Sequence, residues 1–236
     1  MKWIKRIFYS ILIILLLFVT ILGIQGFIMY QNAAKDNNIA IQIEKIREDE
    51  NYISLDLVPT MYKDAVVAVE DRRFYKHGAI DIISIGRAII TNIKKFDLVE
   101  GGSTITQQIA KNIFFTQEES AIRKIAEIFM AFDLESRYEK DDILELYLNT
   151  SYFGYGYTGI KEASLGYLGK QPIEMTDYES TLLAGVPNAP SAYSPRSNME
   201  LAKKRQQKVI SSLVKNNYIS QDQANTILEQ ESKDFK

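Results

Sequence analysis

Residues 7–30 form a predominantly apolar stretch without any charge, whereas charged residues stand on both sides of it. An α-helix crosses the hydrocarbon core of a bilayer with about 20 apolar residues, so the stretch predicts one transmembrane helix. Lys2, Lys5 and Arg6 precede it. Because basic flanks stay on the cytoplasmic side, we expect residues 1–6 to be a cytoplasmic tail. The chain after residue 30 should then lie outside the cytoplasm, held by a single-pass anchor in the cell membrane.

A cleaved signal peptide is the alternative for this N-terminal stretch. The apolar region of a signal peptide typically has about 7–15 residues and is followed by a cleavage site of small residues. The stretch here is longer, and the sequence YQNAA at residues 30–34 is a poor cleavage site. We therefore expect a retained anchor.

The pattern after the anchor changes twice. Residues 31–58 are mostly polar and predict a stalk or linker. A helix should then start at Pro59 and Thr60, because proline interrupts the preceding structure and threonine can cap a helix. Most later segments have the 3.6-residue period of amphipathic helices, and no run of alternating residues predicts a series of strands. We expect a mainly α domain over residues 59–236.

Residues 80–98 carry a single apolar stripe flanked by basic residues. The stripe consists of Ile82, Ile85, Ile89, Ile93 and Phe96, and the basic residues are Arg87, Lys94 and Lys95. A helix of this kind can lie in the headgroup layer of a membrane. The same pattern also fits a helix whose stripe faces the protein core. The sequence leaves both interpretations open.

Composition excludes several classes of function. The 236 residues are enough for one domain and an anchor, and the formal net charge of −2 gives no general attraction to nucleic acid. There is no cysteine, which excludes disulfides and thiolate metal sites.

The segment GGSTITQQIAKN at residues 101–112 is a candidate anion site. Two glycines stand directly before a predicted helix start, and Lys111 follows two turns into that helix. Free N–H groups, the helix dipole and a lysine together can hold an anion. A capped helix after a glycine turn is the simpler alternative. The segment lacks the GxxxxGK[ST] pattern of a nucleotide-binding P-loop.

Two glutamates are candidate catalytic residues. Glu70 ends the apolar run of residues 65–69, which suits it to proton transfer, although a solvated glutamate at a helix end is the alternative. Glu127 lies in the sequence IAEIFMAFDL, which predicts a buried helix. Since a buried glutamate needs a partner, Arg123 and Lys124, one turn earlier, are expected to pair with it. A structural ion pair is the alternative there. The only histidine, His77, is expected to have a packing or hydrogen-bonding role.

Three further segments are interpreted as scaffold. Residues 116–119 form a capping-box pattern that should open the helix of Glu127. Residues 140–149 predict a core-facing helix with Glu145 and Asn149 as buried polar linkers. The proline-rich turn after residue 185 is expected to shape one wall of a cleft.

Five segments occur together and in one order: EDRRFYKH with Asp81, GGSTITQQIAKN, RKIAE, KDDILELYLN and LLAGVPNAPSAYSP. In this order they resemble the family 51 glycosyltransferases, which are peptidoglycan glycosyltransferases. The resemblance covers about residues 58 to 215 and is carried most specifically by GGSTITQQ. It implies a mostly α, lysozyme-like fold and, because the chain ends near residue 236, a monofunctional member with a membrane anchor.

The resemblance implies that lipid II is polymerised by inverting transfer from a growing glycan strand, linked to undecaprenyl pyrophosphate, to the 4-hydroxyl of lipid II. Glu70 matches the general base, and Glu127 matches the second glutamate, which assists the leaving group and the metal arrangement. Positions that match substrate-binding ones are Asp71, Ser103, Thr104, Gln107, Gln108, Lys111, Asn112, Arg123 and Lys124. Mg²⁺ or Mn²⁺ as cofactor is implied by the resemblance alone. Expected partners are lipid II, the glycan strand, membrane lipid and other proteins of cell-wall synthesis.

The sequence departs from the family pattern in three places. His77 is followed by Gly78-Ala79 where the family has one residue and then glycine, and the family's basic residues near Glu119 and at Ala126 are missing. Lys124 or Arg137 would then have to compensate. Two other functions stay open: a lysozyme-like lytic enzyme that cleaves glycan, and a non-catalytic scaffold that binds lipid II.

Overall fold

Helices dominate the computed structural model, which describes residues 2–36, 38–95, 101–115 and 120–230. The described residues contain no strand, only an isolated antiparallel bridge between Tyr152 and Thr158, so the mainly α prediction is confirmed. The α-helices are α1 (Lys2–Asp36), α2 (Ile39–Arg47), α3 (Thr60–Glu70), α4 (Ile82–Lys95), α5 (Ile105–Phe114), α6 (Ala121–Arg137), α7 (Lys140–Thr150), α8 (Gly159–Leu168), α9 (Asp177–Ala184), α10 (Pro190–Tyr193), α11 (Met199–Lys215) and α12 (Gln221–Glu229). Short 3₁₀ turns occur at Leu55–Leu57, Phe74–Lys76, Pro172–Glu174 and Val186–Asn188.

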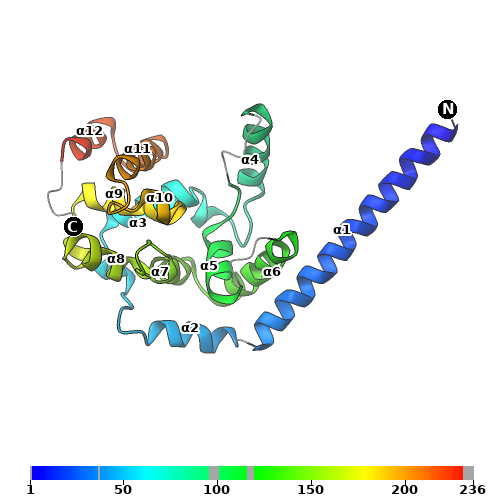
Figure 1. Ribbon diagram of the computed structural model, residues 1–236, viewed down its shortest axis with the longest axis horizontal. Coiled ribbons are helices and arrows are strands. Elements are labelled where there is room, and N and C mark those ends of the chain that lie inside the picture. The colour runs from blue at the N-terminus through cyan, green and yellow to red at the C-terminus, as the bar shows by residue number, and fades with distance from the viewer. Residues whose placement is uncertain (1, 37, 96–100, 116–119, 231–236) are drawn as a thin grey trace.

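Helix α1 projects away from the domain as a long rod (Figure 1). Among the described residues it is the one helix long and apolar enough to cross a membrane, and no residue of its most apolar window is buried. The helix therefore indicates a membrane location, while the orientation of the chain across the membrane stays a prediction.

The last turns of α1 pack against α6. Gly26 is buried there, and a Cβ atom on it would lie 2.5 Å from Cγ2 of Ile125. The rings of Phe27 and Tyr30 lie 5.1 and 6.0 Å from the ring of Phe129. The anchor is thus joined to the domain by a packed interface.

Part of the segment predicted as a stalk also packs on the domain. Ile39 and Ile43 of α2 are buried and belong to the hydrophobic core. Ile53 exchanges two 2.9 Å hydrogen bonds with the side chain of Asn149, and Glu145 accepts a 2.7 Å hydrogen bond from the backbone of Leu55. The predicted stalk or linker of residues 31–58 thus packs in part against the domain. Asn149 and Glu145 link it to α7, although both are half-buried rather than buried.

Helix α3 packs against both α9 and α11, which also contact each other. It starts at Thr60 with Pro59 as its N-cap residue, so the expected cap by Thr60 is wrong. Tyr62, Ala65 and Val66 are buried and hold the helix in place. Its C-terminal residue is Glu70, whose position is consequently fixed by the core.

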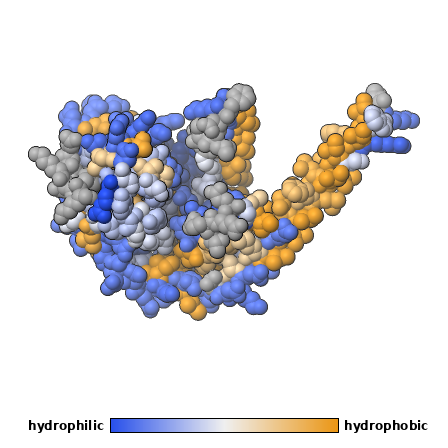
Figure 2. Space-filling view, viewed as in Figure 1, coloured by the Kyte–Doolittle hydropathy of each residue, from blue (hydrophilic) through white to orange (hydrophobic). Residues whose placement is uncertain are grey.

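Helix α4 presents its apolar side to the outside. Five isoleucines are more than half exposed, namely Ile82, Ile83, Ile89, Ile90 and Ile93, and Ala88 is the one buried residue of this helix. The core-facing interpretation of residues 80–98 is therefore wrong for α4, whereas Phe96 lies outside the described residues. Figure 2 shows the apolar side of α4 on the flank that faces α1.

Candidate active site

The loop at residues 101–104 enters α5 through a capping box. The Thr104 hydroxyl accepts a 3.2 Å hydrogen bond from the backbone N–H of Gln107, and the Gln107 side chain accepts one of 3.2 Å from the Thr104 N–H. The Thr104 hydroxyl also donates to the carbonyl of Ala79 at 2.9 Å. Thr104 and Gln107, which the sequence places among the substrate-binding residues, are thus used to fix the helix start.

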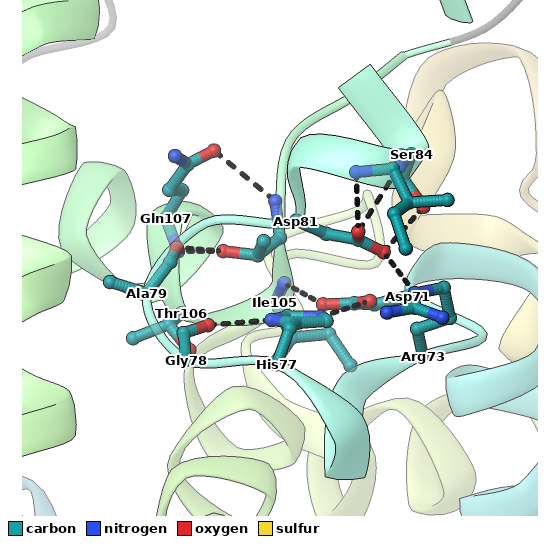
Figure 3. A network of polar contacts seen from close by, with 12 residues as sticks. Asp71, Arg73, His77, Gly78, Ala79, Asp81, Ser84, Ile105, Thr106 and Gln107 are labelled. Carbon is teal, nitrogen blue, oxygen red and sulfur yellow. Dashed lines mark hydrogen bonds and ion pairs between the residues drawn. The ribbon is translucent and has the colours of Figure 1, made fainter. Parts of the chain in front are cut away.

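Asp71 and His77 connect the end of α3 to the start of α5 (Figure 3). His77 Nε2 lies 2.8 Å from Oδ1 of Asp71, and Nδ1 lies 2.6 Å from the carbonyl oxygen of Gly78. Asp71 Oδ2 accepts a 3.1 Å hydrogen bond from the backbone N–H of Ile105. Both partners of the ring are acceptors, so the ring donates to both when it is protonated. The structural role expected for His77 is confirmed.

The pKa of His77 follows from this arrangement. Burial disfavours the charged ring, but the hydrogen bonds to Asp71 and to the Gly78 carbonyl favour it more, and the pKa of His77 is raised. Asp71 lines the large cavity described below, yet both of its oxygens are already bonded within the protein.

Asp71, His77 and Asp81 are also the one acid and histidine group among the described residues whose ligand atoms lie close enough for a metal ion, within 4.8 Å of each other. Asp81 accepts hydrogen bonds from Arg73 Nε at 3.1 Å and from the Ser84 hydroxyl at 2.6 Å. Burial would raise the pKa of Asp81, but the bonds from Ser84 and the charge of Arg73 lower it overall. Mg²⁺ and Mn²⁺ need several free oxygen ligands. The carboxylate oxygens of Asp71 and Asp81 already accept hydrogen bonds within the protein, so this cluster does not fit such an ion.

Glu70 is held by two side chains at the end of α3. Gln108 Nε2 donates to Oε2 at 3.0 Å, and Arg205 Nη2 lies 3.3 Å from Oε1. The Glu70 side chain is 9% exposed and lines the larger cavity described below. Arg205 comes from α11 and was not predicted, because it is 135 residues away in the sequence. In the sequence, Arg205 stands out only as a basic residue within a segment that has the pattern of an amphipathic helix.

Glu127 is buried in α6 at 1% exposure. Arg123 Nε lies 2.9 Å from Oε1, and Lys124 Nζ lies 2.7 Å from Oε2. Lys124 also donates to the hydroxyl of Ser103 at 2.8 Å. The predicted pairing of Glu127 with Arg123 and Lys124 is confirmed. Helix α6 takes Ser120 as its N-cap, and the capping box expected at residues 116–119 lies outside the described residues.

Two cavities adjoin between these glutamates. The smaller, of about 210 Å³, is lined by Ser103, Gln107, Gln108, Lys111, Arg123, Lys124 and Glu127. The larger, of about 660 Å³, contains Glu70 in its wall. Ser103, Gln108 and Lys111 line both cavities. The two glutamates therefore face neighbouring parts of one groove.

Positive side chains surround this groove. Lys111 lies at the junction of the two cavities and forms no side-chain hydrogen bond or ion pair with the described residues. The larger cavity is lined in addition by five basic residues, Arg72, Arg87, Arg205, Lys208 and Lys215. A groove of this composition favours a ligand that carries several negative charges.

Asn112 lies elsewhere. Its side chain contacts the carbonyl of Thr150 at 3.5 Å and lines a separate cavity with residues of α2 and α7. Asn112 therefore does not line this groove, because its face of α5 packs against α7.

The departures from the family pattern have local explanations. Ala79 is buried without a positive φ, so no glycine is required at that position. Ala126 is fully buried and supplies no charge. Arg137 pairs with Asp133 at 2.5 Å and lines neither cavity, so it does not replace a missing cation, whereas Lys124 lies in the smaller cavity. Glu119 lies outside the described residues.

The family model and the sequence relatives identify the same family. The Transglycosylase family model matches residues 36–235. Penicillin-binding protein 1F of Bacillus subtilis is 43% identical over 179 residues, which are 76% of this chain and 25% of that protein. Penicillin-binding protein 1A of Aquifex aeolicus is 42% identical over 172 residues, 73% of this chain and 24% of that protein. The chain thus spans about a quarter of the length of these relatives. The crystal structure of penicillin-binding protein 1A from Haemophilus influenzae aligns with a TM-score of 0.47 at 22% identity, covering 77% of this chain and 17% of that one.

Proposed function

This chain belongs to the transglycosylase family, and from that premise we propose that it polymerises lipid II into the glycan strands of peptidoglycan. The observation that carries the proposal is the single groove between Glu70 and Glu127, with Lys111 at the junction of its two cavities. The groove has both an acidic group for proton transfer and fixed positive charge for a leaving pyrophosphate.

In the proposed reaction, Glu70 is the general base. The 4-hydroxyl oxygen of lipid II attacks the anomeric carbon of the growing strand, and the hydroxyl proton passes to Glu70. The bond between that carbon and the pyrophosphate oxygen breaks, and the pyrophosphate leaves with the electron pair. A correctly placed base accelerates such a step by about 10²–10⁴-fold. Gln108 and Arg205 orient the carboxylate through their contacts with its two oxygens.

The smaller cavity is proposed to hold the leaving pyrophosphate. Charge gathers on the pyrophosphate as its bond breaks, so fixed cations stabilise the transition state more than the ground state. Lys111, Arg123 and Lys124 supply these cations. In this proposal Glu127 does not react; it holds Arg123 and Lys124 in place through two ion pairs of 2.9 and 2.7 Å.

The charge around Glu127 also distinguishes this proposal from a lytic enzyme. A glycosidase needs a carboxylic acid that donates a proton to a sugar oxygen. Here Glu127 is paired with two cations, and Glu70 contacts Arg205. Pyrophosphate needs charge neutralisation rather than a proton, so the surroundings of both acids favour transfer.

Helices α1 and α4 support a reaction at the membrane. The substrate and the growing strand both carry lipid tails, and the apolar sides of these two helices lie on the same flank of the molecule (Figure 2). We propose that this flank rests in the outer leaflet, with the N-terminus in the cytoplasm and the domain outside. Other proteins of cell-wall synthesis are proposed as partners.

The test feeds the purified full chain with lipid II and, separately, with intact glycan strands. We expect lipid-linked polymer from the first substrate and no soluble fragments from the second. Soluble fragments from intact glycan would replace this proposal with a lytic one. Binding of lipid II without any polymer would leave only the scaffold.

A further inference from the structure

A loop after α7 has an unusual backbone. Gly154, Tyr155 and Gly156 have φ values of +84°, +54° and +84°. Positive φ is uncommon for a residue with a side chain and persists only where the surrounding structure enforces it. Tyr155 in this loop is 51% exposed to solvent.

Buried polar contacts enforce this conformation. The hydroxyl of Tyr167, a fully buried residue, donates to the carbonyl of Phe153 at 2.8 Å and lies 2.9 Å from the hydroxyl of Ser194. A Cβ atom on Gly154 would lie 3.3 Å from the carbonyl oxygen of Pro190. The loop is thereby fixed against the segment that contains α10.

Two tyrosine rings and one cation form the outer side of this loop. The guanidinium of Arg196 lies 5.1 Å from the centre of the Tyr155 ring. Tyr152 is 50% exposed, and its hydroxyl accepts a 3.3 Å hydrogen bond from the backbone N–H of Gly156. We call Tyr152, Tyr155 and Arg196 the tyrosine platform.

The segment that holds Arg196 of the platform also supplies part of the groove wall. Pro187, Asn188 and Tyr193 line the larger cavity. The following residues of the same segment, Ser194 and Arg196, contact the Tyr167 hydroxyl and the Tyr155 ring. Arg196 follows Tyr193 by only three residues, so the platform lies close to the part of the cavity that Tyr193 lines.

We propose that the tyrosine platform binds the sugar rings of the growing glycan strand as the strand leaves the groove. This inference rests on the proposed function and adds a second binding site to it. The C–H face of a pyranose ring is apolar and can lie on an aromatic ring, while the tyrosine hydroxyls and Arg196 can reach its polar substituents. Tyrosines that are already fixed lose little conformational entropy when a ligand binds.

The first experiment measures binding without catalysis. The full chain in detergent micelles is titrated with a soluble tetrasaccharide of β-1,4-linked N-acetylglucosamine, and the dissociation constant is measured by calorimetry. Tyr155→Asn should weaken binding about tenfold, as for a central aromatic contact. Asparagine is chosen because it tolerates a positive φ and so keeps the loop conformation. Tyr155→Phe keeps the ring and should retain binding.

One further variant is a control and another is an independent test. Tyr218→Asn changes a tyrosine that is 36% exposed in the turn after α11, and it should bind like the unmodified chain. Arg196→Gln leaves the loop backbone untouched and should weaken binding about threefold by removing the cation above the ring. It keeps the proposal testable if Tyr155→Asn does not fold.

The second experiment measures the length of strands made from lipid II. Tyr155→Asn should make strands that are at least about twofold shorter, since weaker retention favours earlier release, while Tyr218→Asn should not shorten them. Equal binding and equal strand length in Tyr155→Asn and the unmodified chain would overturn the proposal, as would a platform that captures a protein but no saccharide. If the chain binds the tetrasaccharide through Tyr155 yet makes no polymer, the proposed function fails and the saccharide site stands.

Discussion

Tyr30 in the anchor helix donates a 2.9 Å hydrogen bond from its hydroxyl to Oδ2 of Asp133 in α6. Asp133 lies less than two turns beyond Glu127 on the same helix. The membrane anchor therefore contacts the helix that carries the pyrophosphate-binding cations of the proposed site.

Gly26→Leu should separate α1 from α6. A Cβ atom at this position would lie 2.5 Å from Ile125, and overpacking of this kind costs about 1–3 kcal/mol. We expect a lower rate of polymerisation in vesicles, because Arg123 and Lys124 shift with α6. The matched control is Gly23→Leu on the same helix, where nothing lies within 4 Å of an added Cβ. Equal loss of rate in both variants would show that the packing of α1 on α6 has no part in catalysis.

Glu70→Gln should lower the rate of polymerisation by about 10²–10⁴-fold, the usual contribution of a general base. The amide keeps the shape of the side chain and its contact with Gln108, so the thermal unfolding temperature should change little. The rate is measured from the consumption of lipid II, with Glu200→Gln on the exposed side of α11 as control. A normal rate in Glu70→Gln would remove Glu70 from its proposed role.

Glu127→Gln should also reduce turnover, because Arg123 and Lys124 lose the carboxylate that holds them. Binding of inorganic pyrophosphate, measured by calorimetry, should weaken together with the rate. If the variant polymerises lipid II normally, Glu127 is only a structural ion-pair residue.

His77 should make the stability of the domain depend on pH. Burial opposes its charge, but the bonds to Asp71 and the Gly78 carbonyl raise its pKa above the unfolded value of 6.5. A raised pKa contributes stability that is fully present below the unfolded value and is lost as pH rises through the folded value. The difference in unfolding free energy between the unmodified chain and His77→Gln should therefore shrink from pH 5.5 toward pH 8.5. A difference that is constant over this range would contradict the charged His77–Asp71 pair.

The exposed isoleucines of α4 should lie in the membrane. The test introduces Ile89→Trp into a Trp3→Phe background, which removes the only other tryptophan. In vesicles containing brominated lipids the fluorescence of this tryptophan should be quenched. Ile173→Trp, at a position that is 53% exposed in the turn after α8, is the control and should not be quenched. Absence of quenching at residue 89 would place α4 in water.

Local spacing explains which parts of the site were predictable. Arg123, Lys124 and Glu127 lie three and four residues apart on one helix, so their contact follows from helix geometry alone. Lys111 and Asn112 are neighbours in sequence but lie about 100° apart around α5, and only the first faces the groove. The sequence alone does not show which face of α5 packs against α7.

Contacts between distant segments could not be predicted in the same way. Arg205 reaches Glu70 because α11 packs along α3, and nothing near residue 205 indicates that neighbour. The packing of residues 31–58 on the domain was missed for a different reason. Ile39 and Ile43 stand four residues apart, the spacing of a buried helix face, but the flanking residues 31–38 and 44–52 are mostly polar.

The packed junction between α1 and α6 has a consequence for the lipid environment. A transmembrane helix that is longer than the hydrocarbon core of the bilayer can adjust by tilting. Because α1 packs against α6 at Gly26 and Tyr30, a change in the tilt of α1 would displace the helix that carries Arg123 and Lys124. The rate of polymerisation should therefore depend on the acyl-chain length of the surrounding lipid, even with the same substrate at the same concentration.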